Sequence, residues 1–303
     1  MNKAQIKNSF LLFLTAFIWG SAFVAQSVGM DHVGPFTFNC VRSFVGGLVL
    51  IPCIAFLRSL KKKEEGNKVE RKTLVTKVEL IGGICCGVAL FAASNMQQVG
   101  ILYTTVGKSG FITALYVVIV PILGIFLKKR VPKIIWFCVG LSVVGLYLLC
   151  MTGETFTLNK GDMFILICAV LFSFHILIID YFSPRGDGVV ISCIQFFTCG
   201  ILSVVLMFAT ETPNVTDILA AKWPILYAGV LSSGVAYTLQ VVAQKNVNPT
   251  VASLILCLES VVSALTGWLI LHEILSSREL LGCVLMFVAI VLAQIPIPER
   301  KKK

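Results

Sequence analysis

Ten apolar stretches follow one another along this chain of 303 residues, and each is long enough to cross a lipid bilayer. A helix needs roughly 20 apolar residues to span the ~30 Å hydrocarbon layer. The predicted spans are residues 10–27, 35–57, 80–97, 105–127, 134–151, 161–181, 189–209, 224–243, 250–271 and 280–296. The first is too long, and lacks the cleavage site, to be a removed signal peptide. With 57% hydrophobic and 13% charged residues, the sequence predicts an all-α integral membrane protein with ten transmembrane helices.

The second half of the chain repeats the first. Residues 115–124 align with residues 258–267 at a constant offset, which places Tyr116 on Glu259. Because each copy has an odd number of spans, the second copy must enter the membrane from the opposite side. We therefore predict two inverted five-helix repeats, residues 9–151 and residues 161–296.

The net charge of +10 is explained by membrane topology rather than by a nucleic-acid partner. With the N-terminus inside, the inner loops and tails hold twenty lysine and arginine residues, and the outer loops hold only Lys160, Lys222 and Arg278. Positive residues accumulate on the cytoplasmic side of membrane proteins. We therefore predict that both termini are cytoplasmic and that residues 58–79 form a basic cytoplasmic loop.

The eleven cysteines all fall inside predicted spans, without a C-x-x-C pair or a histidine at metal-ligand spacing. This placement favours small apolar packing residues over a disulfide framework. No metal ion and no cofactor is expected.

Glu259 is the most informative ionisable residue within a span. A charged side chain at the bilayer centre costs about 2.5–3.5 kcal/mol on insertion scales, so each one needs an explanation. Glu259 lies nine residues into its span, roughly 14 Å deep at 1.5 Å per residue. Loss of water favours the neutral carboxyl there, so Glu259 could take up and release a proton during transport. The alternative is a purely structural carboxyl group.

Arg42 and His175 are the other candidates. Arg42 lies about seven residues inside its span and could hold a substrate carboxylate or pair with Glu259 or Asp180. His175 could relay protons, although a lone histidine is also a common hydrogen-bonding packing residue. Lys108, near the outer end of its span, could extend to the interface.

Uncharged polar residues form stripes at helical spacing and point to the interior of the bundle, because lipid cannot satisfy them. They predict a central cavity, and the alternative is hydrogen bonding between helices. Trp19 is expected to form an aromatic wall of this cavity. The predicted cavity residues are Trp19, Asn39, Arg42, Asn95, Gln98, Tyr116, Tyr237, Gln240 and Gln244.

Small residues and one proline suggest local features of packing. The Gly83-x-x-x-Gly87 pattern predicts a close approach of two helices. Pro121 is expected to kink the fourth span. Its counterpart Ala264 cannot do so, which predicts a local difference between the halves.

Several of these residues also carry a family resemblance. Trp19-Gly20-Ser21-Ala22-Phe23, Pro35 and Arg42 in the first half, and residues 267–273 followed by Leu280-Leu281-Gly282 in the second, resemble the EamA branch of the drug/metabolite transporter superfamily. The resemblance covers nearly the whole chain in two units. It implies a solute carrier of a bacterial inner membrane, usually an exporter of metabolites or amino acids. The first half departs from the pattern, with Lys129-Arg130-Val131-Pro132 where the second keeps His272-Glu273.

The sequence therefore predicts a secondary transporter that moves small polar or amphipathic metabolites by alternating access through a central cavity. Its partners are a small-molecule substrate, the lipid bilayer and, through Glu259 and His175, protons. A flippase for lipids or lipid-linked intermediates and a channel remain alternatives. A membrane-embedded enzyme is disfavoured because the chain has no H-E-x-x-H, aspartate-rich or G-x-S-x-G motif.

Overall fold

The computed structural model describes residues 3–65, 75–104, 106–128, 131–150, 159–245, 247–270 and 276–293. Within these ranges every regular element is helical, as predicted. The elements are α1 (Lys3–Gly29), α2 (Pro35–Glu65), α3 (Lys77–Ile101), α4 (Val106–Ala114), α5 (Tyr116–Phe126), α6 (Lys133–Cys150), α7 (Lys160–Phe182), the 3₁₀ turn η2 (Ser183–Arg185), α8 (Gly188–Thr210), α9 (Val215–Ala220), α10 (Lys222–Leu226), the π-helix η3 (Tyr227–Tyr237), α11 (Thr238–Gln244), α12 (Pro249–Leu256), α13 (Glu259–Ile270) and α14 (Ser277–Ala293). Parts of the predicted basic loop, Lys129-Arg130 and His272-Glu273 lie outside the described residues.

Eight segments in the described part of the chain are long and apolar enough to cross a membrane. Some of them join two or three helices, as in Val106–Phe126, Lys222–Gln244 and Pro249–Ile270. The other two predicted spans correspond to shorter apolar helices, Lys133–Leu148 and Leu280–Ala293. The protein is therefore a multi-pass membrane protein.

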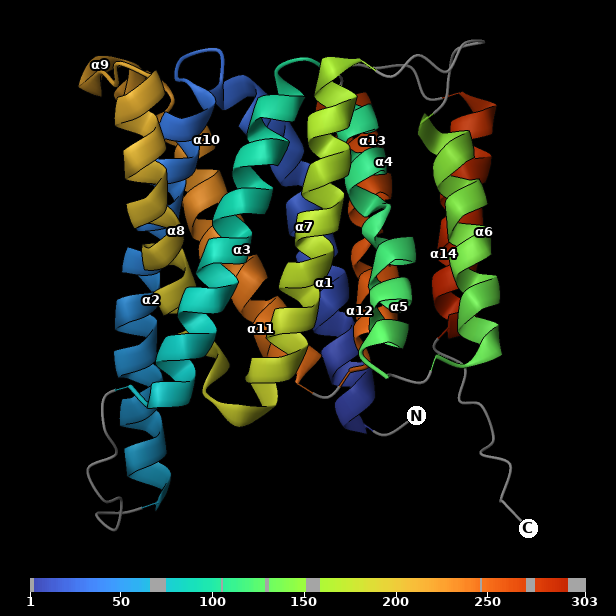
Figure 1. Cartoon of the computed structure of the whole chain (residues 1–303), viewed down its shortest axis with the longest axis horizontal. Coiled ribbons are helices and arrows are strands. Elements are labelled where there is room, and N and C mark those ends of the chain that lie inside the picture. Colours follow the sequence, from blue (N-terminus) through green and yellow to red (C-terminus); the bar gives the residue numbers. More distant parts are fainter. Residues whose placement is uncertain are drawn as a thin grey trace.

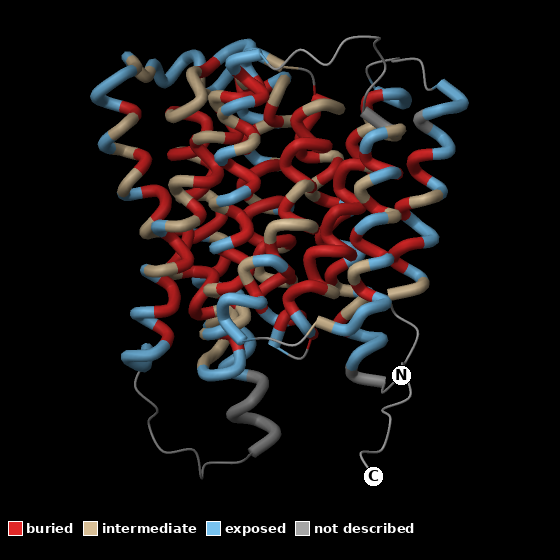
Figure 2. The backbone as a smooth tube through the Cα atoms, turned by 45° about the vertical axis from the view of Figure 1, so that its right-hand side comes forward, coloured by how far each residue is buried: buried red, intermediate tan, exposed pale blue. Residues whose placement is uncertain are grey.

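Polarity is distributed as a lipid environment requires. Large apolar side chains such as Phe17, Phe56 and Phe208 are exposed on the outer surface of the bundle. Polar side chains such as Gln98 and Ser203 are fully buried inside it. Figure 2 shows this interior as a continuous buried core between exposed ends. Backbone and side-chain polar groups cannot be satisfied by lipid, so they gather between the helices.

The fourth and ninth predicted spans are both interrupted, and the kink expected at Pro121 stays a prediction. Helix α4 ends at Ala114 and α5 begins at Tyr116, five positions before Pro121. Proline disturbs its own turn and the carbonyl four residues earlier, whereas α5 remains helical through Pro121. The ninth span is interrupted at Cys257 and Leu258 without an internal proline. The halves therefore share a break at aligned positions.

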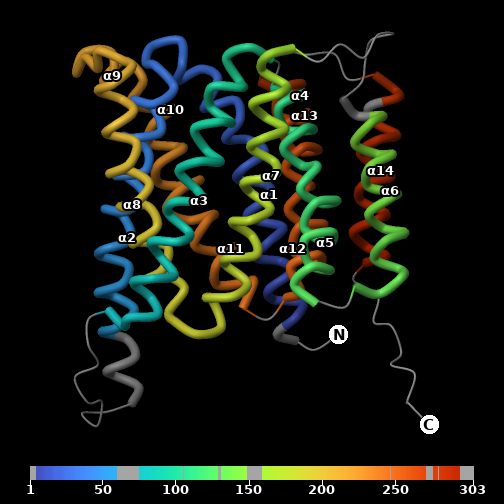
Figure 3. The backbone as a smooth tube through the Cα atoms, in the orientation of Figure 1, coloured from blue at the N-terminus to red at the C-terminus, as the bar shows by residue number. Residues whose placement is uncertain are grey.

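Aligned helices of the two halves pack against each other. Helices α2 and α8 are neighbours at one end of the molecule, and α6 and α14 are neighbours at the other (Figure 1). Each pair runs in opposite directions, as the chain colours in Figure 3 show. Helix α1 begins and α14 ends at the same face of the bundle (Figure 3).

The expected close packing at Gly83 and Gly87 is confirmed. A Cβ atom added at Gly83 would lie 2.5 Å from the Cβ of Ile194, and one at Gly87 would lie 2.5 Å from the Cβ of Thr198. Both distances are far below a normal contact. The two glycines therefore allow α3 to approach α8.

Two buried or half-buried carboxylates connect the halves at the face opposite the start of α1. Lys108 on α4 forms an ion pair with Asp162 on α7, with Nζ and Oδ2 2.5 Å apart. Glu211, after α8, accepts hydrogen bonds from the backbone N–H groups of Phe36 and Thr37 at 2.9 and 2.8 Å. A carboxylate is well placed there because the first N–H groups of a helix have no partner within it.

Candidate functional site

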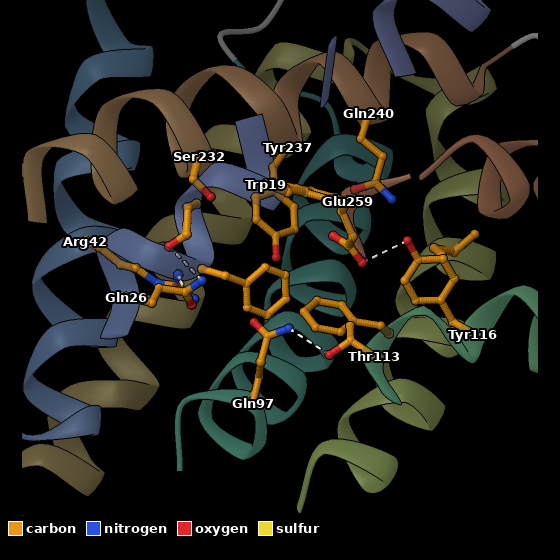
Figure 4. Close-up of a pocket in the computed structure, with 14 residues that line it drawn as sticks. Trp19, Gln26, Arg42, Gln97, Thr113, Tyr116, Ser232, Tyr237, Gln240 and Glu259 are labelled. Carbon is orange, nitrogen blue, oxygen red and sulfur yellow. Dashed lines mark hydrogen bonds between the residues drawn. The ribbon is translucent and has the colours of Figure 1, made fainter. Parts of the chain in front are cut away.

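A cavity lies in the middle of the bundle and is lined by both halves of the chain (Figure 4). It is small, with a cavity volume of about 30 Å³. The lining side chains come from α1, α2, α3, α4, α5, α7, η3, α11 and α13. They are Trp19, Ala22, Phe23, Gln26, Arg42, Gln97, Thr113, Tyr116, Phe172, Ile176, Ser232, Tyr237, Gln240 and Glu259.

Arg42 supplies a guanidinium group to this cavity. Its Nη1 donates to Oε1 of Gln26 at 2.9 Å, and the amide of Gln26 is oriented by a bond from Nε2 to the carbonyl of Ala22 at 3.3 Å. The guanidinium also lies 5.9 Å from the ring centre of Phe38. Arg42 is only 4% exposed, yet among the described residues no carboxylate pairs with it. Arginine has five N–H donors, so most of its hydrogen-bonding capacity is available to a ligand.

Glu259 supplies a carboxyl group from another side of the cavity. The hydroxyl of Tyr116 donates to its Oε1 at 2.9 Å, the contact drawn as a dashed line in Figure 4. Tyr116 and Glu259 are the first residues of α5 and α13, directly after the two helix breaks. Both side chains are buried. The residues that the repeat aligns with each other therefore touch each other at the cavity.

Aromatic rings form one wall. The rings of Trp19 and Tyr237 lie 4.4 Å apart at 54°, and the ring of Phe196 lies 5.5 Å from Tyr237. The indole Nε1 of Trp19 is buried without a hydrogen-bond partner among the described residues. This wall therefore offers both stacking surface and one free N–H donor.

Five of the nine predicted cavity residues line this cavity: Trp19, Arg42, Tyr116, Tyr237 and Gln240. The proposed proton carrier Glu259 lines it as well, whereas His175 lies behind Tyr237, with their ring centres 5.9 Å apart. The functional roles of these residues stay predictions.

The other four predicted residues face helix interfaces. Asn39 donates to Oδ1 of Asn95 at 3.0 Å, and Asn95 donates to the carbonyl of Phe91 at 2.8 Å, so this pair joins α2 and α3. Gln244 donates to the carbonyl of Ile176 at 3.3 Å. Gln98 is buried away from the cavity. These contacts agree with the alternative interpretation of the stripes as bonds between helices.

Sequence reasoning missed Gln26, Gln97 and Ser232 as lining residues. Gln97 donates from Nε2 to Oγ1 of Thr113 at 3.2 Å and closes one side of the cavity. Gln26 lies near the end of the first predicted span and was not singled out. In the structure α1 continues to Gly29, and Gln26 is buried in the bundle.

Comparisons with known proteins agree on the kind of molecule. The profile of the EamA-like transporter family matches residues 7–151 and 159–294. An uncharacterized transporter of Archaeoglobus fulgidus is 31% identical over 94% of this chain and 84% of its own length. An S-adenosylmethionine/S-adenosylhomocysteine transporter of Chlamydia muridarum is 21% identical over 87% of this chain and 84% of its own.

The fold also matches a solved structure. A protein crystal structure with 17% sequence identity superposes with a TM-score of 0.74, over 95% of this chain and 96% of that one. At this identity the likeness shows the fold alone. The curated relatives are named transporters rather than enzymes. The two matched segments cover nearly all of the sequence, and the chain therefore belongs to the EamA-like transporter family.

Proposed function

We propose that the protein is a secondary transporter that exports a small polar or amphipathic metabolite by alternating access through the central cavity. One observation carries this proposal: Arg42 and Glu259 are both buried at the same cavity without pairing with each other. A buried guanidinium without a carboxylate partner is costly unless something else neutralises it. A substrate that enters the cavity supplies that partner.

Arg42 binds the anionic group of the substrate in this proposal. A guanidinium recognises carboxylate and phosphate oxygens through two parallel hydrogen bonds, and the bond to Gln26 holds it in place. Trp19 and Tyr237 provide stacking surface for an apolar or aromatic part. S-adenosylmethionine, named for the Chlamydia relative, is an amino-acid derivative with a carboxylate, and compounds of that general kind would suit this cavity.

Glu259 carries the coupling proton. Among the described residues its carboxyl group has one donor, the Tyr116 hydroxyl, and the side chain is only 4% exposed, so the neutral form is inexpensive to hold. Deprotonation becomes favourable when water or a cationic part of the substrate reaches the group. Uptake and release of this proton on different sides of the membrane would drive transport.

Two inverted five-helix repeats would provide the alternating access. The break shared by aligned helices, the contact of Tyr116 with Glu259, and the opposed pairs α2/α8 and α6/α14 support this arrangement. In such transporters the site lies between the repeats near the midplane, at discontinuous helices. The distribution of lysine and arginine supports both termini in the cytoplasm, and membership of a family with bacterial inner-membrane members supports a bacterial cell membrane location.

The test is transport in proteoliposomes, with a panel of labelled amino acids and amphipathic metabolites and with pH and sodium gradients applied separately. We expect saturable flux driven by the pH gradient. Glu259→Gln should abolish accumulation against a gradient while substrate exchange continues, because glutamine fills the same space but carries no titrating proton.

Asp31→Asn is the matched control, since Asp31 is exposed on a loop, and it should behave as wild type. Accumulation by the Glu259→Gln protein under a pH gradient would exclude the coupling role. Flux that does not saturate in the wild type would instead indicate a channel.

A further inference from the structure

A second group of buried polar side chains lies beside the cavity, on α11 and on its neighbours α7 and α8. His175 on α7 contacts Gln195 on α8, with Nε2 and Oε1 3.1 Å apart. Gln244 on α11 donates to the carbonyl of Ile176, next to His175. All of these side chains are at most 2% exposed. We call His175, Ser192, Gln195, Gln240 and Gln244 the polar layer.

Every member of the polar layer has a side-chain atom without a hydrogen-bond partner among the described residues. These atoms are Nδ1 of His175, Oγ of Ser192, Nε2 of Gln195, Oε1 of Gln240 and Oε1 of Gln244. Buried polar atoms are almost always paired, and buried water is their usual partner where protein offers none. Acceptors and donors occur together here, as bridging waters require.

The hydrogen bond between His175 and Gln195 fixes which atom of the imidazole faces this water. The amide oxygen of Gln195 only accepts, so Nε2 of His175 carries the hydrogen. The neutral ring then presents the lone pair of Nδ1 to the layer. Nδ1 can accept a proton from one water and return it to another.

The polar layer is continuous with the cavity. Gln240 belongs to both, and Gln244 follows it by one helical turn on the same face of α11. The ring of Tyr237, which lines the cavity, lies 5.9 Å from that of His175. Among the described residues, the titratable and charged groups around the layer are Cys86 and Glu79 on α3, Cys168 on α7, Cys199 on α8 and Tyr237, with Arg42 and Glu259 across the cavity.

An apolar cluster lies beside the layer, near the end of α7 and the start of α8. Ile179, Ile191 and Val241 are each fully buried and pack with Cys86. Ile179 lies one turn beyond His175, and Ile191 one turn before Gln195. We call Ile179, Ile191 and Val241 the apolar seal. By the charge distribution it faces the cytoplasm.

We propose that the polar layer holds a file of water that carries protons between Glu259 and the cytoplasm, with His175 as its positioning residue and the apolar seal as its gate. The proton leaves the Glu259 carboxyl group as a carboxylate forms, passes through water to Nδ1 of His175, and continues to the next water while the ring returns to neutral. This inference rests on the proposed function, because it assigns the route by which the coupling proton travels.

The test compares proton-driven accumulation with equilibrium exchange in proteoliposomes. His175→Leu and Gln195→Leu should lower proton-driven accumulation at least about 100-fold, the lower end for a positioned proton-transfer group, while exchange stays near wild type. His175→Gln, which keeps a polar atom for water, should lose less. His32→Leu is the matched control, since His32 is exposed at the opposite face.

A second variant tests the seal. Ile179→Ser should admit water and produce a proton leak without substrate, measured with an internal pH dye, and His175→Leu added to it should abolish the leak. Ile167→Ser changes an exposed isoleucine of the same helix and should not leak. A parallel fall of accumulation and exchange in His175→Leu, or an Ile179→Ser protein that stays tight, would overturn the inference. Failure of proton drive in the wild type, or its survival in Glu259→Gln, would instead refute the proposed function.

Discussion

Single residues in the cavity depend on partners that lie far away in the sequence. Arg42 is held by Gln26 on the preceding helix, and Glu259 by Tyr116 in the other half of the chain. Among the described residues each of these two groups thus has one side-chain hydrogen bond, which orients it toward the cavity.

At this scale we predict the effect of removing the guanidinium. Arg42→Ala should raise the substrate concentration for half-maximal transport by roughly 10- to 100-fold for anionic substrates, because hydrogen bonds to charged groups contribute about 1.5–3 kcal/mol. Esters of the same compounds should lose much less. Arg185→Ala, at an exposed arginine, is the control. Unchanged half-saturation for the anionic substrate would show that Arg42 does not contact it.

At the scale of helices, the breaks in the fourth and ninth spans bring α1 into very close contact with α13. A Cβ atom at Gly20 would lie 2.5 Å from the carbonyl oxygen of Glu259 and 2.5 Å from Cβ of Val262. Packing therefore requires a glycine at Gly20. The neighbouring Trp19 can then reach the cavity wall while its backbone stays against α13.

Gly20→Ala is expected to destabilise the protein by about 1–3 kcal/mol, because the added methyl group overlaps backbone and must displace a helix. Gly140→Ala is the matched control: nothing lies within 4 Å of a Cβ there, and α6 should gain about 0.5–1 kcal/mol from the better helix former. The unfolding temperature measured in mild detergent should therefore fall for Gly20→Ala and rise for Gly140→Ala. Equal shifts would contradict the close contact between α1 and α13.

At the scale of the whole molecule, carboxylates connect the two halves at both faces. Glu211 binds the N-terminus of α2, and Asp162 binds Lys108, both at the face opposite the start of α1. At the other face, Glu79 at the start of α3 accepts a hydrogen bond from the backbone N–H of Asp187 at 2.9 Å. The apolar cluster of Ile179, Ile191 and Val241 lies near this second face.

The orientation of the molecule is testable with reporter fusions. A fluorescent protein at the C-terminus should be fluorescent, because both termini are predicted to be cytoplasmic, and alkaline phosphatase at the same position should be inactive. Phosphatase fused after Asn214, between α8 and α9, should be active. The reverse pattern would invert the assignment of the seal to the cytoplasmic side.

The amino-acid sequence alone was enough to predict helices, their approximate bounds and a membrane location. Hydropathy and turn residues act locally, so each apolar stretch indicates a helix without information from the rest of the chain. The same local logic identified Arg42 and Glu259, because an ionisable group in an apolar stretch is conspicuous wherever it lies.

Only the tertiary structure decided which polar residues share a cavity. Asn39 and Gln240 look alike in the sequence, yet Asn39 bonds to Asn95 between helices and Gln240 faces open space. The break between α4 and α5 at Leu115 was likewise not predicted from the sequence. The rotation of a helix and the helices that it contacts depend on the packing of residues far apart along the chain. No local sequence pattern encodes that packing.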